Sequence, residues 1–429
     1  MKLLLKAGRV INPQEDFDGI ADILIENGLV TEFGKDLPAA GAQIYDADGL
    51  VVTPGLIDMH VHLREPGQEA KEDVGSGTRA AAAGGFTTIA CMPNTRPVVD
   101  SAIIVSGLLQ RAQVEGLVNV KVIGALSKGQ EGRELAEIGD MLQAGAVAIS
   151  DDGHYVENAK LLLNGLEYLT SFGRPIISHA EDESLAGDGS MHEGAVSAML
   201  GINGRPSVAE DIAVARDILL AEYAGGAVHI AHVSSKGAVE LIRQAKQRGI
   251  KVTAEVTPHH LTLTDQAVSS FDTATKVNPP LRSADHVEAL LAGLKDGTLD
   301  AIASDHAPHA FEEKDREYRF APSGFAGLET ALGVVLTNLY HTGKFSLNEI
   351  VERMSSTPAR ILNLNRGVIR AGEAADITII DPDLEWIVDS TRFYTRGRLT
   401  PFDGMQLKGK AIATIVGGKV IMQNGEVHK

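Results

Sequence analysis

Two histidines separated by a single residue give the first chemical signal in this sequence. His60 and His62 lie in an apolar run. If that run is an extended strand, both side chains point to the same face and can chelate one ion. The spacing alone is weak evidence, because a lone strand histidine is more often a hydrogen-bonded core residue. The remaining candidate ligands decide between these two interpretations.

Further histidines and aspartates follow other short apolar runs: Asp152, His179, His232 and Asp305. Buried carboxylates are costly unless they are paired or bind a metal, so this set favours a metal site over a collection of core residues. Imidazole and carboxylate ligands without thiolate suit Zn²⁺ first, with Mn²⁺, Co²⁺ or Fe²⁺ as alternatives. Six protein ligands are too many for one catalytic ion, so we predict two ions that share a carboxylate.

The elements that must position these residues are eight apolar runs that alternate with stretches of helical periodicity. This pattern is typical of parallel strands joined by crossover helices, and it predicts an α/β fold, either a (β/α)₈ TIM-type barrel or an open doubly wound sheet. Because the polar candidates follow the strand ends, where barrel chemistry lies, we expect the barrel. The runs are residues 56–61, 87–92, 118–123, 146–150, 175–178, 228–231, 251–256 and 300–304.

Both ends of the chain predict short strands with turn signals between them. We therefore expect one small β-sandwich domain built from residues 1–53 and 368–429, next to a (β/α)₈ barrel of residues 54–367. The predicted strands are residues 3–10, 20–26, 43–45, 50–53, 376–380, 411–416 and 419–422.

The net charge of the chain disfavours some classes of binding partner. The 429 residues carry a net charge of −18 at pH 7, which disfavours nucleic acid or an anionic membrane as a partner. No apolar stretch approaches the roughly 18 residues of a membrane span. The single cysteine, Cys91, can form no internal disulfide and is expected to be an inert core thiol in a cytoplasmic protein.

Several segments together resemble the bacterial dihydroorotases of the amidohydrolase superfamily, and the resemblance spans nearly the whole chain. The segments are residues 58–64, 92–95, 149–153, 257–260, 278–282 and 304–309. The resemblance implies a zinc-dependent enzyme that reversibly cyclises N-carbamoyl-L-aspartate to L-dihydroorotate in pyrimidine synthesis. It also implies a homodimer and an association with aspartate transcarbamoylase.

The resemblance assigns roles to the candidate ligands. His60 and His62 would bind one zinc ion, His179 and His232 the other, and Asp152 would bridge them. Asp305 would complete the first site and act as general base and then acid while a bridging hydroxide attacks the ring amide. The neighbouring Asp151 is the alternative bridge, and the family register favours Asp152. Many superfamily members place a carboxylated lysine at that position instead.

Because the substrates carry carboxylates, we expect an arginine that can donate two parallel hydrogen bonds to a carboxylate, together with amide donors, near the metals. The resemblance assigns substrate contacts to these side chains and, for the last two, to the backbone: His62, Arg64, Asn94, Asn278, His309, Ser323 and Gly324. Relatives often have a bulkier residue where this chain has Ser323. Asn94 and Asn278 flank prolines and could instead cap turns, and His309 could be a surface histidine.

Two further features have simple interpretations. Residues 311–320 carry seven charged side chains and are most simply a solvated loop, with a mobile lid as the alternative. His259 and His260 follow the seventh predicted strand, and we expect at most a supporting role for them behind the metal ligands.

Three competing functions remain at this point. A hydantoinase or allantoinase is disfavoured because the bridging lysine is absent and Arg64 and Asn94 are present. A deaminase with one metal would leave Asp152 without a role as a ligand. A non-catalytic partner of aspartate transcarbamoylase would be expected to lose metal ligands, and this sequence has all six.

Overall fold

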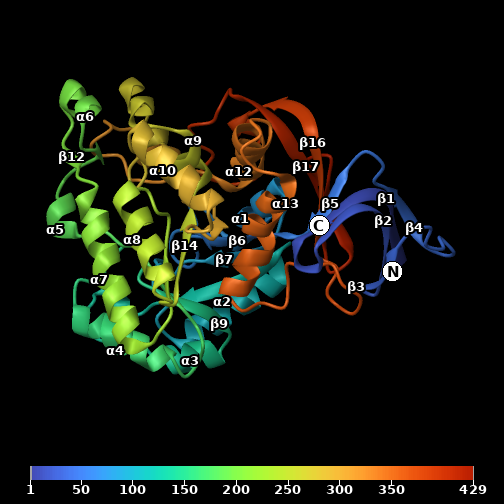
Figure 1. Ribbon diagram of the computed structural model, residues 1–429, viewed down its shortest axis with the longest axis horizontal. Coiled ribbons are helices and arrows are strands. Elements are labelled where there is room, and N and C mark those ends of the chain that lie inside the picture. Colours follow the sequence, from blue (N-terminus) through green and yellow to red (C-terminus); the bar gives the residue numbers. More distant parts are fainter. Residues whose placement is uncertain (1, 429) are drawn as a thin grey trace.

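The computed structural model describes residues 2–428 as a barrel of parallel strands with a large sheet at one end (Figure 1). The eight barrel strands follow the chain order β6-β7-β8-β9-β10-β13-β14-β15. Val61 at the end of β6 forms a parallel bridge with His306, so the first strand meets the chain that leaves the eighth. The predicted barrel is therefore confirmed. The strands are β6 (Leu56–Val61), β7 (Phe86–Cys91), β8 (Asn119–Gly124), β9 (Ala146–Ser150), β10 (Ile176–Ser178), β13 (Val228–Ile230), β14 (Val252–Val256) and β15 (Ala301–Ile302).

The larger helices surround the barrel because each has an apolar face to bury. In α8 the buried residues are Ala238, Val239, Ile242 and Ala245, which form one stripe along the helix. The larger helices are α1 (Val74–Gly84), α2 (Ala102–Glu115), α3 (Ile138–Gln143), α4 (Ala159–Leu169), α7 (Val208–Ala224), α8 (Lys236–Gln247), α10 (Ala284–Lys295) and α12 (Leu328–Val335). Shorter elements are α5 (Glu183–Ala186), β11 (Met191–His192), α6 (Ala195–Leu200), β12 (Gly204–Arg205), α9 (Pro258–Thr262), α11 (Phe311–Lys314), α13 (Leu347–Val351) and α14 (Thr357–Ile361).

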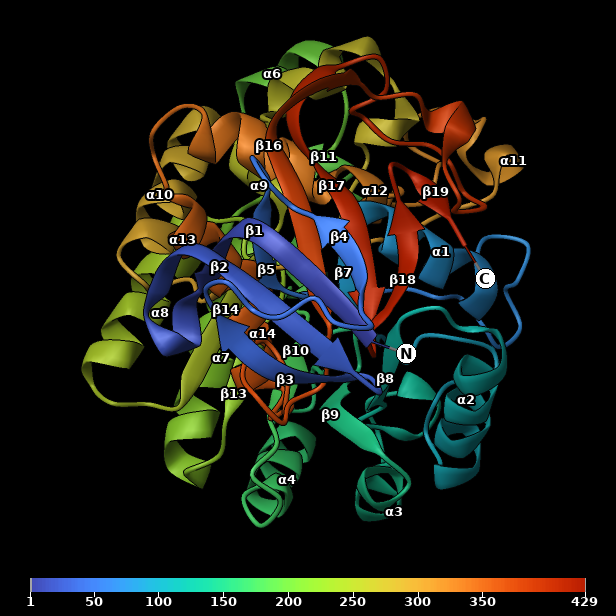
Figure 2. The ribbon, with the colours of Figure 1, turned by 90° about the vertical axis from the view of Figure 1, so that its right-hand side faces the viewer.

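Strands from both chain ends form one sheet, as the sequence predicts (Figure 2). Its order is β19-β18-β17-β16-β5-β1-β2-β3, and β4 pairs with β1. The two ends meet where β5 runs antiparallel to β16, with Val52 opposite Ile379. The domain limits at 53/54 and 367/368 stay predictions. The strands are β1 (Lys2–Asn12), β2 (Phe17–Glu26), β3 (Leu29–Gly34), β4 (Gln43–Asp46), β5 (Val51–Pro54), β16 (Ile377–Ile387), β17 (Gln406–Val416), β18 (Lys419–Gln423) and β19 (Glu426–Val427).

The predicted end of the first C-terminal strand at Ile380 is wrong. Strand β16 continues through Asp381 and Pro382 to Ile387, with a shift in its register against β17 between Asp381 and Glu385. Proline cannot donate a ladder hydrogen bond, and an irregularity of this kind is where a strand tolerates one. Strands β3 and β19 were not predicted either.

The core of the barrel makes its strand ends the natural place for polar groups. Every residue of β6, β7 and β9 is buried, as expected for parallel strands that are covered on both faces. Met59, Ala90, Ile123 and Ile177 belong to one apolar cluster, and a separate cluster that includes Ile23 and Ile415 fills the sheet. Side chains with polar chemistry gather beyond the apolar layers.

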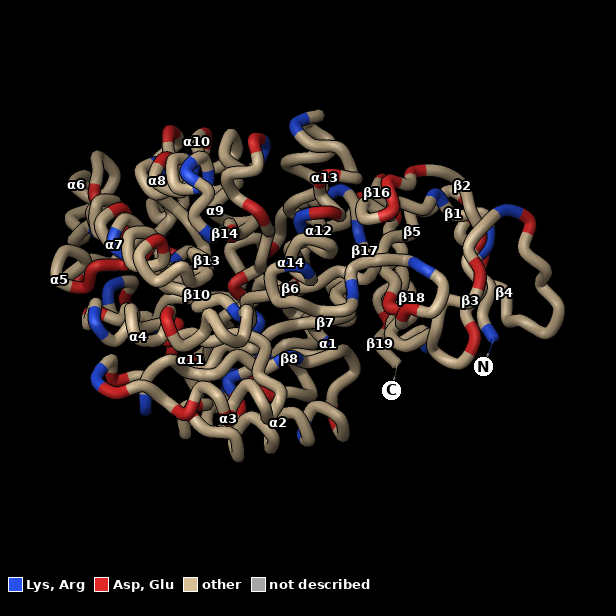
Figure 3. Tube along the Cα trace, turned by 60° about the horizontal axis from the view of Figure 1, so that its bottom comes forward, with Lys and Arg blue, Asp and Glu red and all other residues tan. Residues whose placement is uncertain are grey.

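Charged residues are spread over the barrel helices and the sheet, with basic and acidic segments interspersed (Figure 3). Several form ion pairs, such as Arg243 with Asp296 at 2.9 Å on the outer helices. Among residues 2–428, no helix has the length and apolar character needed to cross a membrane.

Candidate metal centre and active site

The carboxyl ends of four barrel strands bring a histidine or an aspartate to one place. His60 lies in β6, Asp152 follows β9, His232 follows β13 and Asp305 follows β15. All four side chains are buried. Two groups of three residues have ligand atoms close enough to hold a metal ion: His60, His62 and Asp305, and His60, Asp152 and His232.

The first group is held at distances that match a metal site. His62 Nε2 lies 3.3 Å from Asp305 Oδ1 and 3.5 Å from Asp152 Oδ2. His60 Nε2 lies 3.4 Å from Asp152 Oδ1 and 3.6 Å from Asp305 Oδ1. Ligand bonds of about 2.1 Å to a tetrahedral ion would separate two ligand atoms by about 3.4 Å.

Hydrogen bonds fix the orientation of both rings. His60 Nδ1 donates to Glu255 Oε1 at 2.6 Å, and His62 Nδ1 donates to Asn94 Oδ1 at 2.9 Å. With the proton on Nδ1, a neutral ring has its lone pair on Nε2 facing carboxylate oxygens, an arrangement that is repulsive without a cation between them. Within residues 2–428, His60 Nε2 and Asp152 Oδ1 have no hydrogen-bond partner. These residues therefore fit a metal ion.

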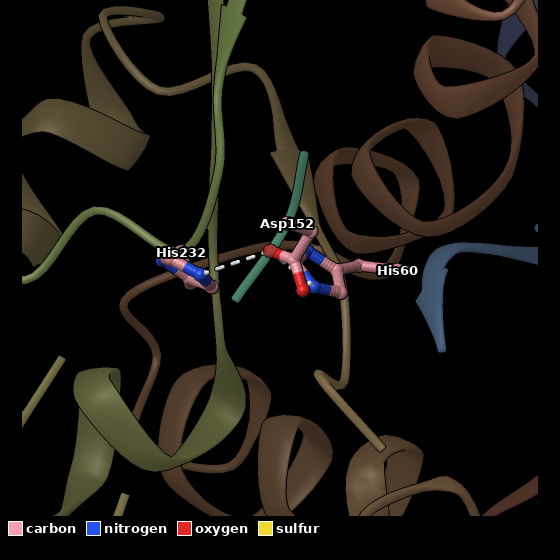
Figure 4. Close-up of side chains that lie close together, drawn as sticks. All are labelled: His60, Asp152 and His232. Carbon is pink, nitrogen blue, oxygen red and sulfur yellow. Dashed lines mark ion pairs between the residues drawn. The ribbon is translucent and has the colours of Figure 1, made fainter. Parts of the chain in front are cut away.

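The second pair of histidines also converges on Asp152, which Figure 4 shows between His60 and His232. His232 Nε2 and His179 Nδ1 lie 3.6 and 3.7 Å from Asp152 Oδ1. The two histidine nitrogens are 2.9 Å apart. They would have to separate by a few tenths of an ångström to share an ion, so this group fits a metal less closely than the first.

The two neighbouring aspartates face opposite directions. Asp151 accepts hydrogen bonds from the backbone N–H groups of Leu126 and Ser127, at 2.8 and 3.0 Å, and from the Ser127 hydroxyl. These contacts tie Asp151 to the segment that follows β8. Asp152 is the aspartate that faces the histidines.

Both carboxylates of the cluster are ionised. Burial by itself raises the pKa of Asp305, but the hydrogen bond with His62 and the nearby rings of His60 and His232 outweigh it, and the pKa lies below the ordinary range. Burial also raises the pKa of Asp152. The contacts with His60, His179 and His232 outweigh burial and keep this pKa well below its usual range.

A cavity of about 220 Å³ opens over the cluster. It is lined by residues that include every substrate-contact residue predicted from the sequence: His62, Arg64, Asn94, Asn278, His309, Ser323 and Gly324. Gly324 has φ +117°, and a Cβ there would lie 2.6 Å from Ala307 O, so only glycine fits this wall.

Comparison with known proteins identifies the family. Residues 49–238 match the family model described as "Dihydro-orotase-like", and residues 328–422 match the model described as "Amidohydrolase family". The chain is 55% identical to a dihydroorotase of Pelotomaculum thermopropionicum over 424 residues, covering 99% of each chain. It is 53% identical to a dihydroorotase of Citrifermentans bemidjiense, covering 99% of this chain and 100% of the relative. The chain belongs to the dihydroorotase family.

Solved structures share the fold of this dihydroorotase family member. An L-hydantoinase from Arthrobacter aurescens superposes with a TM-score of 0.90 at 29% identity, covering 100% of this chain and 97% of the other. A dihydropyrimidinase from Brevibacillus agri superposes with a TM-score of 0.86 at 25% identity, covering 100% and 96%. Sequence identity to the dihydroorotases is thus about twice as high as to these hydantoinase-type enzymes.

Sequence reasoning missed Glu255 in this dihydroorotase. Its Oε1 accepts from His60, and its Oε2 lies 3.2 Å from His229 Nε2. Burial opposes ionisation, but His60 and His229 lower the pKa of Glu255 to about 2. The available signal was a carboxylate inside the apolar run 252–256, which is costly unless it is paired.

Other sequence predictions have mixed outcomes. His259 and His260 are buried and belong to neither metal group, and His260 Nε2 donates to Pro279 O at 2.9 Å. Burial raises the pKa of the Cys91 thiol to about 12, in agreement with an inert core cysteine. The solvated loop predicted at 311–320 is wrong in part: Phe311–Lys314 is helix α11, and Lys314 is only 1% exposed.

Proposed function

We propose that this dihydroorotase reversibly cyclises N-carbamoyl-L-aspartate to L-dihydroorotate in pyrimidine synthesis. The observation that carries the proposal is the cluster of buried histidines and aspartates in a cavity that also holds Arg64, in a chain at least half identical to proteins named dihydroorotase. A guanidinium beside a metal centre suits a substrate that carries a carboxylate on the same ring as the amide under attack.

We assign the metal ligands as two sets. His60, His62 and Asp305 would hold one zinc ion, His179 and His232 the other, and Asp152 would serve both. Zinc supplies, when bound, a water that is acidic near neutral pH and a positive charge beside the amide oxygen. The support is that Asp152 Oδ2 faces His62 at 3.5 Å while its Oδ1 faces His232 at 3.6 Å.

Asp305 is the group that moves the proton. Its ionised carboxylate takes the proton from the attacking water and delivers it to the ring nitrogen as the C–N bond breaks. In the cyclisation direction the same carboxylate takes a proton from the carbamoyl nitrogen as that nitrogen attacks the carboxyl carbon, and it returns the proton to the oxygen that leaves as water when the C–O bond breaks. Asp305 Oδ1 lies 3.3 Å from His62 Nε2, and it lines the cavity in which the substrate would bind.

The remaining cavity residues bind and orient the substrate. Arg64 would bind the carboxylate, with its Nε fixed by Pro308 O at 3.2 Å. The Asn94 amide nitrogen is available to the same carboxylate, because the Asn94 oxygen already accepts from His62. Burial and the nearby Arg64 lower the pKa of His309 to about 2, so the ring is neutral. Its Nε2 donates to Ser323 O at 2.9 Å and its Nδ1 lies 3.5 Å from Glu313 Oε2, so we assign His309 to holding the cavity wall at Ser323 beside the substrate.

Asn278 takes a more limited part than the resemblance suggests. Its side-chain NH₂ group donates to Glu181 Oε2 at 3.0 Å and to His179 Nε2 at 3.2 Å, and its oxygen accepts from Arg205 at 2.5 Å. Both donors are used, so we assign Asn278 to holding His179 and, through its remaining lone pair, to accepting one substrate N–H.

The test is the loss of dihydroorotate absorbance on adding purified protein, with metal analysis of the same sample and with hydantoin and allantoin in parallel. Turnover of dihydroorotate with close to two zinc ions per chain is the expected result. Two metal ions with activity on hydantoin or allantoin alone would keep the site and overturn the substrate.

Three further proposals rest on the family resemblance: a homodimer, an association with aspartate transcarbamoylase, and a cytoplasmic location. Sedimentation of the pure protein, alone and mixed with the transcarbamoylase, tests the first two. Sedimentation of the pure protein at the mass of one chain would overturn the homodimer, and sedimentation of the two proteins as separate, unshifted species in the mixture would overturn the association.

A further inference from the structure

Two buried lysines lie behind one wall of the substrate cavity. Lys314, at the end of α11, is 1% exposed, and Lys276 is 7% exposed. Lys314 Nζ donates to Pro322 O at 2.9 Å and to Gly324 O at 2.8 Å. Lys276 Nζ donates to Tyr318 O at 2.9 Å and to Arg319 O at 2.8 Å. Together the two ammonium groups hold four carbonyl oxygens of residues 318–324.

This arrangement joins the two lysines directly to the wall. The Gly324 N–H donates to Lys276 O at 2.8 Å, and Thr273 donates to Lys314 O at 2.8 Å. Ser323 O is held from the other side by His309 Nε2 at 2.9 Å. Three consecutive carbonyl oxygens, those of residues 322–324, are therefore bound by protein donors and kept from facing an anionic substrate.

Burying the two charged ammonium groups costs folding free energy. Within residues 2–428, neither ammonium forms an ion pair with a carboxylate, although Asp272 acts on Lys314 from a distance. Burial lowers the pKa of Lys314 to about 7, and the proximity of Lys276 adds to this. Burial and the nearby Arg205 lower the pKa of Lys276 to about 8. A long apolar side chain would fill either place without this penalty, so the charge calls for a functional reason.

We propose that Lys276 and Lys314 are positioning residues that hold residues 318–324 in the form that presents Ser323 and Gly324 to the substrate, and that give this wall a positive charge. The inference deepens the proposed function and rests on it. Neither lysine lines the cavity, so neither touches the reacting atoms. Their effect therefore belongs to substrate binding and depends on the negative charge of the substrate.

The two directions of the reaction provide an internal comparison. Carbamoyl-aspartate carries two carboxylates and dihydroorotate carries one, so a positive wall favours the first more strongly. In Lys314→Met and Lys276→Met we expect the KM for carbamoyl-aspartate to rise about tenfold and that for dihydroorotate about threefold, with kcat changed less than either. Lys344→Met, at an exposed position of the same residue type, is the matched control and should leave both KM values unchanged.

The pH profile of the wild-type enzyme tests the charge without any substitution. The groups that face the pair are Asp272 and Arg205, with the Tyr318 ring 5.7 Å from Lys276 Nζ. As the pH rises from about 6.5 to 8.5 the two ammonium groups lose their protons, so the ratio of the carbamoyl-aspartate KM to the dihydroorotate KM should rise. This rise should be smaller in each lysine variant.

The possible results distinguish a failure of this inference from a failure of the proposed function. A wild-type KM ratio that stays constant across this pH range, or KM values that rise equally for both substrates in the variants, would overturn the inference and leave the lysines a structural role. If either variant fails to fold, the wild-type profile alone decides. A wild-type protein without activity on either compound would overturn the proposed function instead.

Discussion

His60 Nδ1 lies 2.6 Å from Glu255 Oε1, although the two residues are 195 positions apart in the chain and belong to different strands. This contact sets the proton on Nδ1 and turns Nε2 toward Asp152 and Asp305. A carboxylate behind a histidine ligand fixes the ring and increases its basicity. Glu255 thus sets how tightly His60 can bind a metal.

Glu255→Gln should weaken metal binding. The amide can present its NH₂ to His60 Nδ1, which would leave the proton on Nε2, the nitrogen needed by the metal. We expect zinc affinity to fall by about 10- to 100-fold, measured by competition with a coloured chelator. Glu240→Gln, on the exposed side of α8, is the control. Wild-type zinc affinity in Glu255→Gln would contradict this role.

Replacing the two neighbouring aspartates should give different defects. Asp152→Ala removes the carboxylate that faces the histidines, so metal content should fall sharply. Asp151→Ala removes an acceptor of two backbone N–H groups, which should cost about 1–3 kcal/mol of unfolding free energy and leave more of the metal bound. Metal analysis and thermal unfolding of both variants check this. The reverse order of metal loss would mean that Asp151 is the bridging residue.

Asp305→Asn should remove the proton carrier while the fold survives, because the two side chains have nearly the same volume. We expect kcat to fall by about three orders of magnitude or more, with little change in the circular dichroism spectrum. Steady-state kinetics in both directions, corrected for metal content, provide the measurement. Normal turnover would show that another group carries the proton.

Arg64→Lys should act on substrate capture. An ammonium cannot reproduce the two parallel hydrogen bonds of a guanidinium with a carboxylate, and Arg64 is also fixed by Pro308 O. The expected result is a KM that rises about tenfold in each direction with a smaller change in kcat. An unchanged KM would argue against a carboxylate contact at this position.

Glu329 predicts a pH-dependent stability outside the metal centre. Burial raises its pKa to about 8, above the ordinary value of 4.5, while the N–H groups of Tyr394 and Thr395 donate to it. The folded protein therefore binds a proton that the unfolded chain releases, and this contribution to stability is lost as the pH rises from about 4.5 to 8. Glu329→Gln keeps a neutral side chain, so its unfolding midpoint should fall less over this range than that of the wild type. Parallel curves for the two proteins would show that Glu329 does not titrate in this way.

The sequence alone determined the barrel strands and most of the candidate site. The runs 56–61 and 146–150 match β6 and β9 residue for residue, because a strand buried on both faces is rich in apolar residues throughout its length. The ligand candidates lie in or directly after such strands, so the local pattern was enough to find them. At the eighth strand the prediction of 300–304 was too long, since Asp300 binds the backbone of Ala254 with its side chain and the strand covers only Ala301–Ile302.

Only the tertiary structure decided which polar groups support that site. Glu255 and Lys314 have the local sequence of a strand interior and of a charged loop, and neither pattern encodes a partner. Glu255 can be buried because it pairs with His60. Lys314 can be buried because it donates to the carbonyl oxygens of Pro322 and Gly324. The choice of Asp152 over Asp151 likewise depends on Leu126 and Ser127, which hold Asp151 away from the histidines. Such contacts arise when strands distant in sequence close into one barrel, because the cost of burying a charge is met only by partners that the closed fold brings within hydrogen-bonding distance.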